Sequence, residues 1–132
     1  MNVKELRKDR TTRKGWVRKL DTIVSEIVRL RDKKSVTSGE TDSLTCSHLF
    51  SRVAYSTRWD LLNCHAQTLS ENFRHEYDPY PYTQWFIKKY GQEAYEDLHR
   101  KFSTPVQVKT WQMKEMYEQF KTIKEELMQK DI

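Results

Sequence analysis

The apolar positions of the chain recur with helical spacing in two long segments. From Trp16 to Leu30 they are three or four residues apart, which is the period of one helix face, and this predicts a helix over about residues 15–32. The triplet Thr104, Pro105 and Gln107 matches an N-terminal helix cap, so a second helix is expected over residues 104–129. Its apolar stripe, which indicates a packed core face or a contact with a partner helix, consists of Val108, Trp111, Met116, Phe120, Ile123 and Leu127.

The middle of the chain alternates between polar stretches and short apolar runs. Residues 32–42 contain almost nothing apolar and predict a loop, whereas 43–55 alternate as a short strand does and 57–62 suggest a second extended piece. A short exposed helix is expected over 66–77, and helical spacing on both sides of Gly91 predicts two more short helices. The expected fold class is therefore α+β, mostly helical.

Composition narrows the class of protein. The chain has 132 residues, which is enough for one domain, and a formal net charge of +5. Because 12% of the residues are aromatic, a packed core is expected. No apolar run approaches the roughly 20 residues of a membrane helix, and no apolar segment follows the basic start as in a signal peptide. With only Cys46 and Cys64, a disulfide framework is excluded, and a cytoplasmic protein with reduced thiols is expected.

Positive charge is concentrated before the first predicted helix. Residues 1–14 form a basic arm ahead of a domain over 15–132, and lysines and arginines of this kind bind phosphate by releasing counterions. A solvated terminus is the structural alternative. The basic residues of the arm are Lys4, Arg7, Lys8, Arg10, Arg13 and Lys14.

A histidine and two asparagines stand in an order that suggests a catalytic site. His48 lies near the end of the first predicted strand, Asn63 after the second, and Asn72 on the helix that follows. This order resembles an HNH nuclease site, a ββα-metal centre, here expected over residues 33–76 and flanked by the two long helices. The chemistry requires a base with a pKa near neutrality and a cation beside the phosphate. Each residue also has a structural reading, as a strand histidine bonded to a carbonyl or as turn and cap asparagines.

The surrounding sequence resembles the phage NinG (Rap) family of recombination nucleases. The resemblance covers about residues 33–102 and is carried by Ser47-His48-Leu49, Thr57-Arg58-Trp59-Asp60, Asn63-Cys64-His65-Ala66-Gln67 and Lys89-Tyr90-Gly91. It implies a phage-encoded DNA endonuclease in the bacterial cytoplasm, acting on branched or flapped intermediates. In that role His48 is the general base, Asn63 braces its loop, and Asn72 with His48 holds Mg²⁺ or Mn²⁺.

The chain departs from the family pattern where the family has two Cys-x2-Cys pairs for a structural zinc. The aligned positions are Ser35 and Ser38, then Thr68 and Glu71. Neutral hydroxyl groups do not replace thiolates around zinc, so no structural zinc is expected. In addition, Ser47 stands before His48, where many HNH enzymes have an acidic metal ligand.

Two classes of function follow from these observations. In the first, the chain is the nuclease, and the backbone of DNA is held by the basic arm together with Arg52, Arg58, His65, Arg74 and Lys88 or Lys89. In the second, a degenerate HNH fold binds DNA or a host or phage protein as an inhibitor or adaptor. The run from Asp78 to Tyr82 either stacks on unpaired bases or forms a packed turn. A homodimer through the last helix fits the two active sites that cleavage of a junction requires.

Overall fold

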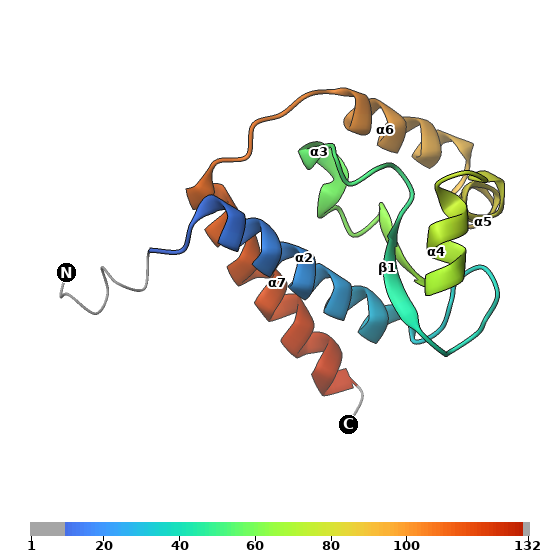
Figure 1. The fold of residues 1–132 in the computed structure, drawn as a ribbon, viewed down its shortest axis with the longest axis horizontal. Helices are drawn as coiled ribbons and strands as arrows, with labels where there is room; N and C mark the ends of the chain where they lie inside the picture. Colours follow the sequence, from blue (N-terminus) through green and yellow to red (C-terminus); the bar gives the residue numbers. More distant parts are fainter. Residues whose placement is uncertain (1–9, 131–132) are drawn as a thin grey trace.

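The computed structural model describes residues 10–130, within which six helices surround one two-stranded hairpin (Figure 1). The fold is α+β and mostly helical, as the sequence predicts. In chain order the elements are α2 (Arg13–Asp32), β1 (Leu44–His48), α3 (Tyr55–Arg58), β2 (Cys64–Thr68), α4 (Leu69–His75), α5 (Tyr80–Tyr90), α6 (Gln92–Ser103) and α7 (Thr110–Lys130).

Helices α2 and α7 run side by side in the same direction and build the larger of two hydrophobic clusters (Figure 1). Near their beginnings Arg13 donates a 2.6 Å hydrogen bond to the carbonyl of Val108, and near their ends Lys124 pairs with Glu26. The predicted stripe of α2 is the buried one, and the helix predicted over 15–32 is confirmed. Its buried residues are Trp16, Leu20, Ile23, Val24, Ile27 and Val28.

Strands β1 and β2 form an antiparallel hairpin in which His48 stands opposite Cys64 and Leu44 opposite Thr68. Both strands contact α2 and α4. Helix α4 begins directly after β2, because Thr68 caps it: the Thr68 side chain accepts from the backbone of Glu71 while the Glu71 side chain accepts from the backbone of Thr68. The order strand, strand, helix expected for residues 33–76 is thus present.

The second strand lies later in the chain than the sequence suggested. Residues 57–62 are not extended: Tyr55–Arg58 form the short helix α3, and the turn after it is closed by a hydrogen bond from Leu62 N–H to Asp60 Oδ1. Burial of Trp59, whose indole N–H reaches Asp21 on α2, overrides the alternation in this segment. As a consequence, Asn63 precedes β2 and does not follow it.

The last helix begins at Thr110, and the cap predicted at residues 104–107 is wrong. Thr104 instead caps the end of α6, where its hydroxyl donates to the carbonyl of Arg100. The chain then runs without helical structure from α6 to the beginning of α7, which lies beside α2 (Figure 1). The physical reason is tertiary: Thr104 is bonded to the end of α6 and the Val108 carbonyl to Arg13 at the start of α2, and an extended segment spans more length between two such points than a helix does. Trp111, assigned to the packed stripe, is 58% exposed, whereas Met113 is buried against α2.

Helices α5 and α6 meet at Gly91 as predicted, with a backbone φ of 98° that glycine adopts without a steric penalty. They hold the smaller hydrophobic cluster, in which Tyr82, Phe86 and Leu98 pack against Leu49, the residue after β1. This cluster therefore supports the chain directly after His48. Among residues 10–130, no helix combines the length and apolar character needed to cross a bilayer.

Candidate functional site

His48 is the last residue of β1, and its imidazole is fixed by one backbone group. Its Nε2 atom lies 2.9 Å from the carbonyl oxygen of Arg58. Because a carbonyl only accepts hydrogen bonds, Nε2 carries the proton and Nδ1 keeps the lone pair of the neutral ring. Burial, reinforced by the positive charges of Arg58 and Arg52, lowers the pKa of His48 below its usual 6.5. The ring is neutral at pH 7 and can accept a proton.

Asn63 braces the loop that follows His48. It is completely buried, its Oδ1 accepts from the N–H of Phe50 at 2.9 Å, and its Nδ2 donates to the carbonyls of Phe50 and Thr57 at 3.0 and 3.1 Å. These bonds tie the segment after β1 to α3. Asn63 thereby fixes the backbone on both sides of the His48 contact.

A cavity of about 580 Å³ brings His48 and Asn72 together. Asn72 lines it from α4, and its side-chain oxygen lies 3.0 Å from the hydroxyl of Ser47, the buried neighbour of His48, which shares its proton with Gln67 Oε1 at 2.7 Å. Glu76 lines the same cavity one helical turn after Asn72. Histidines bonded to a backbone carbonyl are also common in proteins without any catalytic role. The observation that distinguishes His48 is the cavity that it shares with the oxygen-bearing side chains of Asn72 and Glu76.

Glu76 and His75 were missed at the sequence level. Both line the His48 cavity, and His75 Nε2 lies 2.9 Å from the Leu49 carbonyl, while its buried Nδ1 has no hydrogen-bond partner. The available signal was their distance of three and four residues from Asn72, which places all three on one side of a helix. Glu76, the residue directly after α4, therefore places a carboxylate at the cavity that His48 lines.

A second hollow of about 280 Å³ meets the first at His48 and Arg52, and its wall is cationic. Arg29, Arg52 and Arg58 line it, together with a single acidic residue, Asp21. Asp21 holds Arg58 through two hydrogen bonds of 2.9 and 2.6 Å. The guanidinium of Arg58 is therefore already paired, whereas Arg29 and Arg52 add positive charge without a carboxylate partner among the ion pairs of residues 10–130.

Comparison with known protein families shows to which family the chain belongs. The sequence matches the family described as Bacteriophage Lambda NinG protein over residues 2–130. This chain belongs to the NinG family. NinG is a bacteriophage family related to recombination. No curated protein and no solved structure gave a match.

The NinG resemblance assigns four positions to zinc thiolates, and these positions do meet in space. The carboxylate of Glu71 accepts from Ser35 Oγ at 2.7 Å and from the N–H of Thr68 at 2.8 Å. The N–H of Ser38 donates to the same Ser35 hydroxyl at 3.3 Å. Burial acts to raise the pKa of Glu71, but the hydrogen bonds outweigh it and lower this pKa to about 2. Glu71 is thus an anion held by hydroxyl and amide groups of the residues around it.

Several residues expected at a DNA surface lie elsewhere. His65 is 1% exposed, with Nδ1 bonded to Tyr82 at 2.8 Å, and burial lowers its pKa to about 3, so its assignment to phosphate contact does not fit the structure. Arg74 lies outside both hollows and pairs with Asp78 at 2.9 Å. Of the basic arm, Lys4, Arg7 and Lys8 lie outside the described residues, while the exposed Arg10, Arg13 and Lys14 precede or begin α2.

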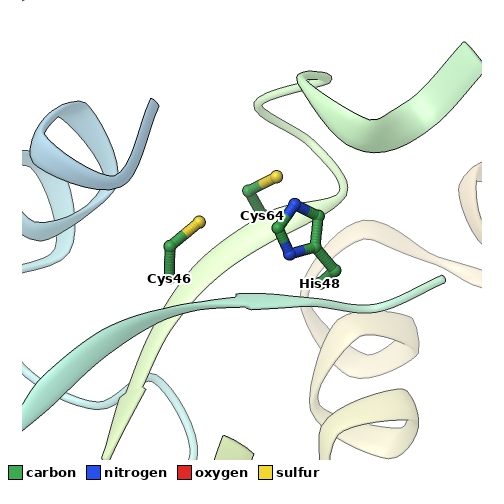
Figure 2. Close-up of side chains that lie close together, drawn as sticks. All are labelled: Cys46, His48 and Cys64. Atoms are coloured by element: carbon green, nitrogen blue, oxygen red, sulfur yellow. The ribbon is translucent and has the colours of Figure 1, made fainter. Parts of the chain in front are cut away.

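The two cysteines lie close to the candidate site, which the sequence did not indicate. Cys46 and Cys64 are both free and lie beside His48 (Figure 2). The contact with Cys46, together with burial, raises the pKa of the Cys64 thiol well above its usual range. The expectation of two reduced thiols agrees with the structure.

Proposed function

We propose that this chain is a metal-dependent DNA endonuclease of the HNH type, acting on branched or flapped intermediates of phage recombination or replication. The observation that carries the proposal is the cavity shared by His48 at the end of β1 and Asn72 on α4. Asn63 braces the segment between them in the chain. Membership of a recombination-related phage family favours DNA as the substrate.

His48 would act as the general base. Its Nδ1 lone pair accepts a proton from the water that attacks phosphorus, while the Arg58 carbonyl keeps the other ring nitrogen protonated. A lowered pKa keeps the ring unprotonated at neutral pH, at some cost in basicity. Asn63 contributes by holding the backbone on which this geometry depends.

Asn72 and Glu76 fit a hard divalent cation. The carbonyl oxygen of Asn72 accepts one hydrogen bond from Ser47 and has a second lone pair, and Glu76 supplies a carboxylate in the same cavity. Oxygen ligands of this kind suit Mg²⁺ or Mn²⁺. When bound, the cation supplies charge stabilisation at the phosphate.

The cationic hollow gives the DNA backbone a place beside the base. Arg52 lines both hollows and Arg29 lines the second, so a phosphate there lies close to His48. Exposed arginines at such a position neutralise phosphate charge and release counterions. The arm residues Arg10, Arg13 and Lys14 would extend this contact along the DNA.

Exposed aromatic rings around α4 favour a substrate with unpaired bases. Phe73, Tyr77 and Tyr80 are 67%, 70% and 69% exposed, and Pro79, next to Tyr80, lines the His48 cavity. Aromatic faces stack on bases that are not paired in a duplex. Tyr82, in the same run as Tyr80, is fully buried and has a packing role.

A catalytically degenerate protein that binds DNA or a host or phage protein is the second candidate. It is favoured by Ser47, which is buried and bonded to Asn72, where many HNH enzymes have an acidic metal ligand. A homodimer through α7 stays a prediction, and the helix already packs much of its apolar face on α2.

The two candidates are separated by cleavage and binding assays on labelled DNA. The full chain is incubated with duplex, flapped and four-way DNA in Mg²⁺, Mn²⁺ or EDTA. We expect cleavage of the branched substrates in either metal and none in EDTA. Salt-sensitive binding without cleavage in both metals would overturn the nuclease and support the binding protein.

A further inference from the structure

The end of the hairpin presents two thiols and an imidazole on one face. Cys46 and His48 are two residues apart on β1, so their side chains leave the same face, and Cys64 stands directly opposite His48 on β2. Figure 2 shows the three side chains side by side, with both sulfur atoms and the ring on the same side of the strands. One ligand atom from each residue lies within 4.8 Å of the other two.

We propose that Cys46, His48 and Cys64 form a binding site for a soft divalent cation, Zn²⁺ in the first place. Two sulfurs and one nitrogen are a known zinc set in which the fourth position stays open. Zinc–sulfur bonds of about 2.3 Å place two thiolates roughly 3.8 Å apart in a tetrahedron. Side-chain adjustments of about 1 Å therefore bring the three residues into coordination.

Two of the three groups already point at one atom. His48 Nε2 lies 2.9 Å from the Arg58 carbonyl oxygen, and the Cys64 thiol donates to the same oxygen at 3.5 Å. A cation at this point replaces protons on the ligands, and the carbonyl oxygen stands beside it. Access does not require opening the core, since Cys46 and His48 line both hollows although Cys64 is buried.

The ligand chemistry separates this site from the one proposed for Mg²⁺ or Mn²⁺. Thiolates and imidazole select zinc-like ions, whereas the oxygen atoms of Asn72 and Glu76 suit hard cations. A disulfide between the cysteines is less suited to the geometry, because Cys46 faces Ala66 and is only diagonal to Cys64. Diagonal neighbours are about 7–8 Å apart, beyond the usual span of a disulfide.

Occupation of this site has a consequence that rests on the proposed function. Neutral imidazole has one lone pair, and a zinc ion bound to either ring nitrogen of His48 uses it. His48 then has no lone pair with which to accept a proton from water. Zinc therefore acts as an inhibitor of the Mg²⁺-dependent cleavage, through two cysteines that have no part in the reaction.

Metal binding is tested directly with cobalt, which reports on its ligands by colour. The full chain, kept reduced and metal-free, is titrated with Co²⁺ and then with Zn²⁺, alongside Cys46→Ala, Cys64→Ala and the control His99→Ala. His99 is exposed on α6 and lines neither hollow. Circular dichroism verifies that each variant is folded. If Cys64→Ala does not fold because Cys64 is buried, the test rests on Cys46→Ala, since Cys46 is only half-buried.

We expect the chain to bind one Co²⁺ with a thiolate charge-transfer band, and Zn²⁺ to displace the Co²⁺. Cys46→Ala should lower the affinity for Zn²⁺ at least tenfold, whereas His99→Ala should not. Absence of the charge-transfer band in the unmodified chain, or equal affinity in Cys46→Ala, overturns the site. Inhibition is then tested by measuring the rate of cleavage with and without Zn²⁺. The ratio of the rate without Zn²⁺ to the rate with Zn²⁺ should be smaller for Cys46→Ala than for the unmodified chain. A chain that binds zinc through the cysteines but never cleaves DNA contradicts the proposed nuclease and leaves the metal site in place.

Discussion

The carbonyl of Arg58 and the imidazole of His48 are joined by a 2.9 Å hydrogen bond that links the short helix α3 to the end of β1. This contact determines which ring nitrogen is free, and the side chain of Arg58 is in turn held by Asp21 on α2. The His48 ring is thus positioned by a backbone group, which substitution of Arg58 alone does not remove.

The proposed cleavage should depend on pH through the lowered pKa of His48. A base whose pKa is lowered below 6.5 is mostly unprotonated at pH 7 and loses activity as the pH falls through that lowered value. We expect kcat/KM to fall on the acidic side of neutrality, with the midpoint of the fall below the ordinary histidine pKa of 6.5. An acidic limb with its midpoint above 6.5 would show that another group, or a raised His48 pKa, controls the rate.

Removing the carboxylate of Asp21 tests the support of Arg58. Asp21→Asn weakens two hydrogen bonds to Arg58 and one to Trp59, and we expect it to lower the free energy of unfolding by about 2 kcal/mol. The measurement is urea denaturation. The matched control is Asp97→Asn, which breaks the exposed pair with Arg100 and should cost about 0.5 kcal/mol or less. Equal losses in the two variants would contradict a structural role for Asp21.

Glu71 should stabilise the fold in a pH-dependent manner. Its pKa of about 2 in the folded chain lies below the ordinary 4.5, so its contribution is fully present above pH 4.5 and is lost as the pH falls towards 2. We expect Glu71→Gln to cost about 2 kcal/mol at pH 7, and less at pH 3. Denaturation at both values measures this, with the exposed Glu118→Gln as the control. A loss that does not change with pH would exclude the carboxylate charge as its cause.

The exposed aromatic rings on α4 and at the start of α5 should contribute to binding of unpaired DNA and not to stability. Tyr80→Ala removes a ring that is 69% exposed, and we expect roughly tenfold weaker binding of flapped DNA, with duplex binding changed little. Fluorescence anisotropy with the two substrates measures the difference. Trp111→Ala, on the exposed part of α7, serves as the comparison and should affect neither. An equal effect of Tyr80→Ala on duplex and flap would contradict base stacking.

Periodicity sufficed to locate the elements that are buried on one face. The stripe from Trp16 to Leu30 predicted α2 nearly to its ends, and the order of His48 and Asn72 predicted a strand followed later by a helix. The second strand was misplaced, because the residues around Trp59 owe their conformation to contacts with Asp21 on a distant helix. Local pattern carries no information on such contacts.

The same limit applies to the site. The roles of His48, Asn63 and Asn72 came from their order in the chain, and all three stay predictions that the geometry supports. His65 was misjudged because its burial depends on Tyr82 and on the aromatic rings of α5, which approach only in the folded chain. The sequence did not connect Cys46 and Cys64 with His48 for the same reason, since only the pairing register of the strands brings the three together.

The most direct test of the account is single-turnover cleavage of four-way and flapped DNA by His48→Ala and His99→Ala, at protein concentrations that saturate binding. We expect His48→Ala to bind these substrates as the unmodified chain does but to cleave them at least 100-fold more slowly, and His99→Ala to match the unmodified chain. Cleavage by His48→Ala at the unmodified rate would contradict His48 as the general base.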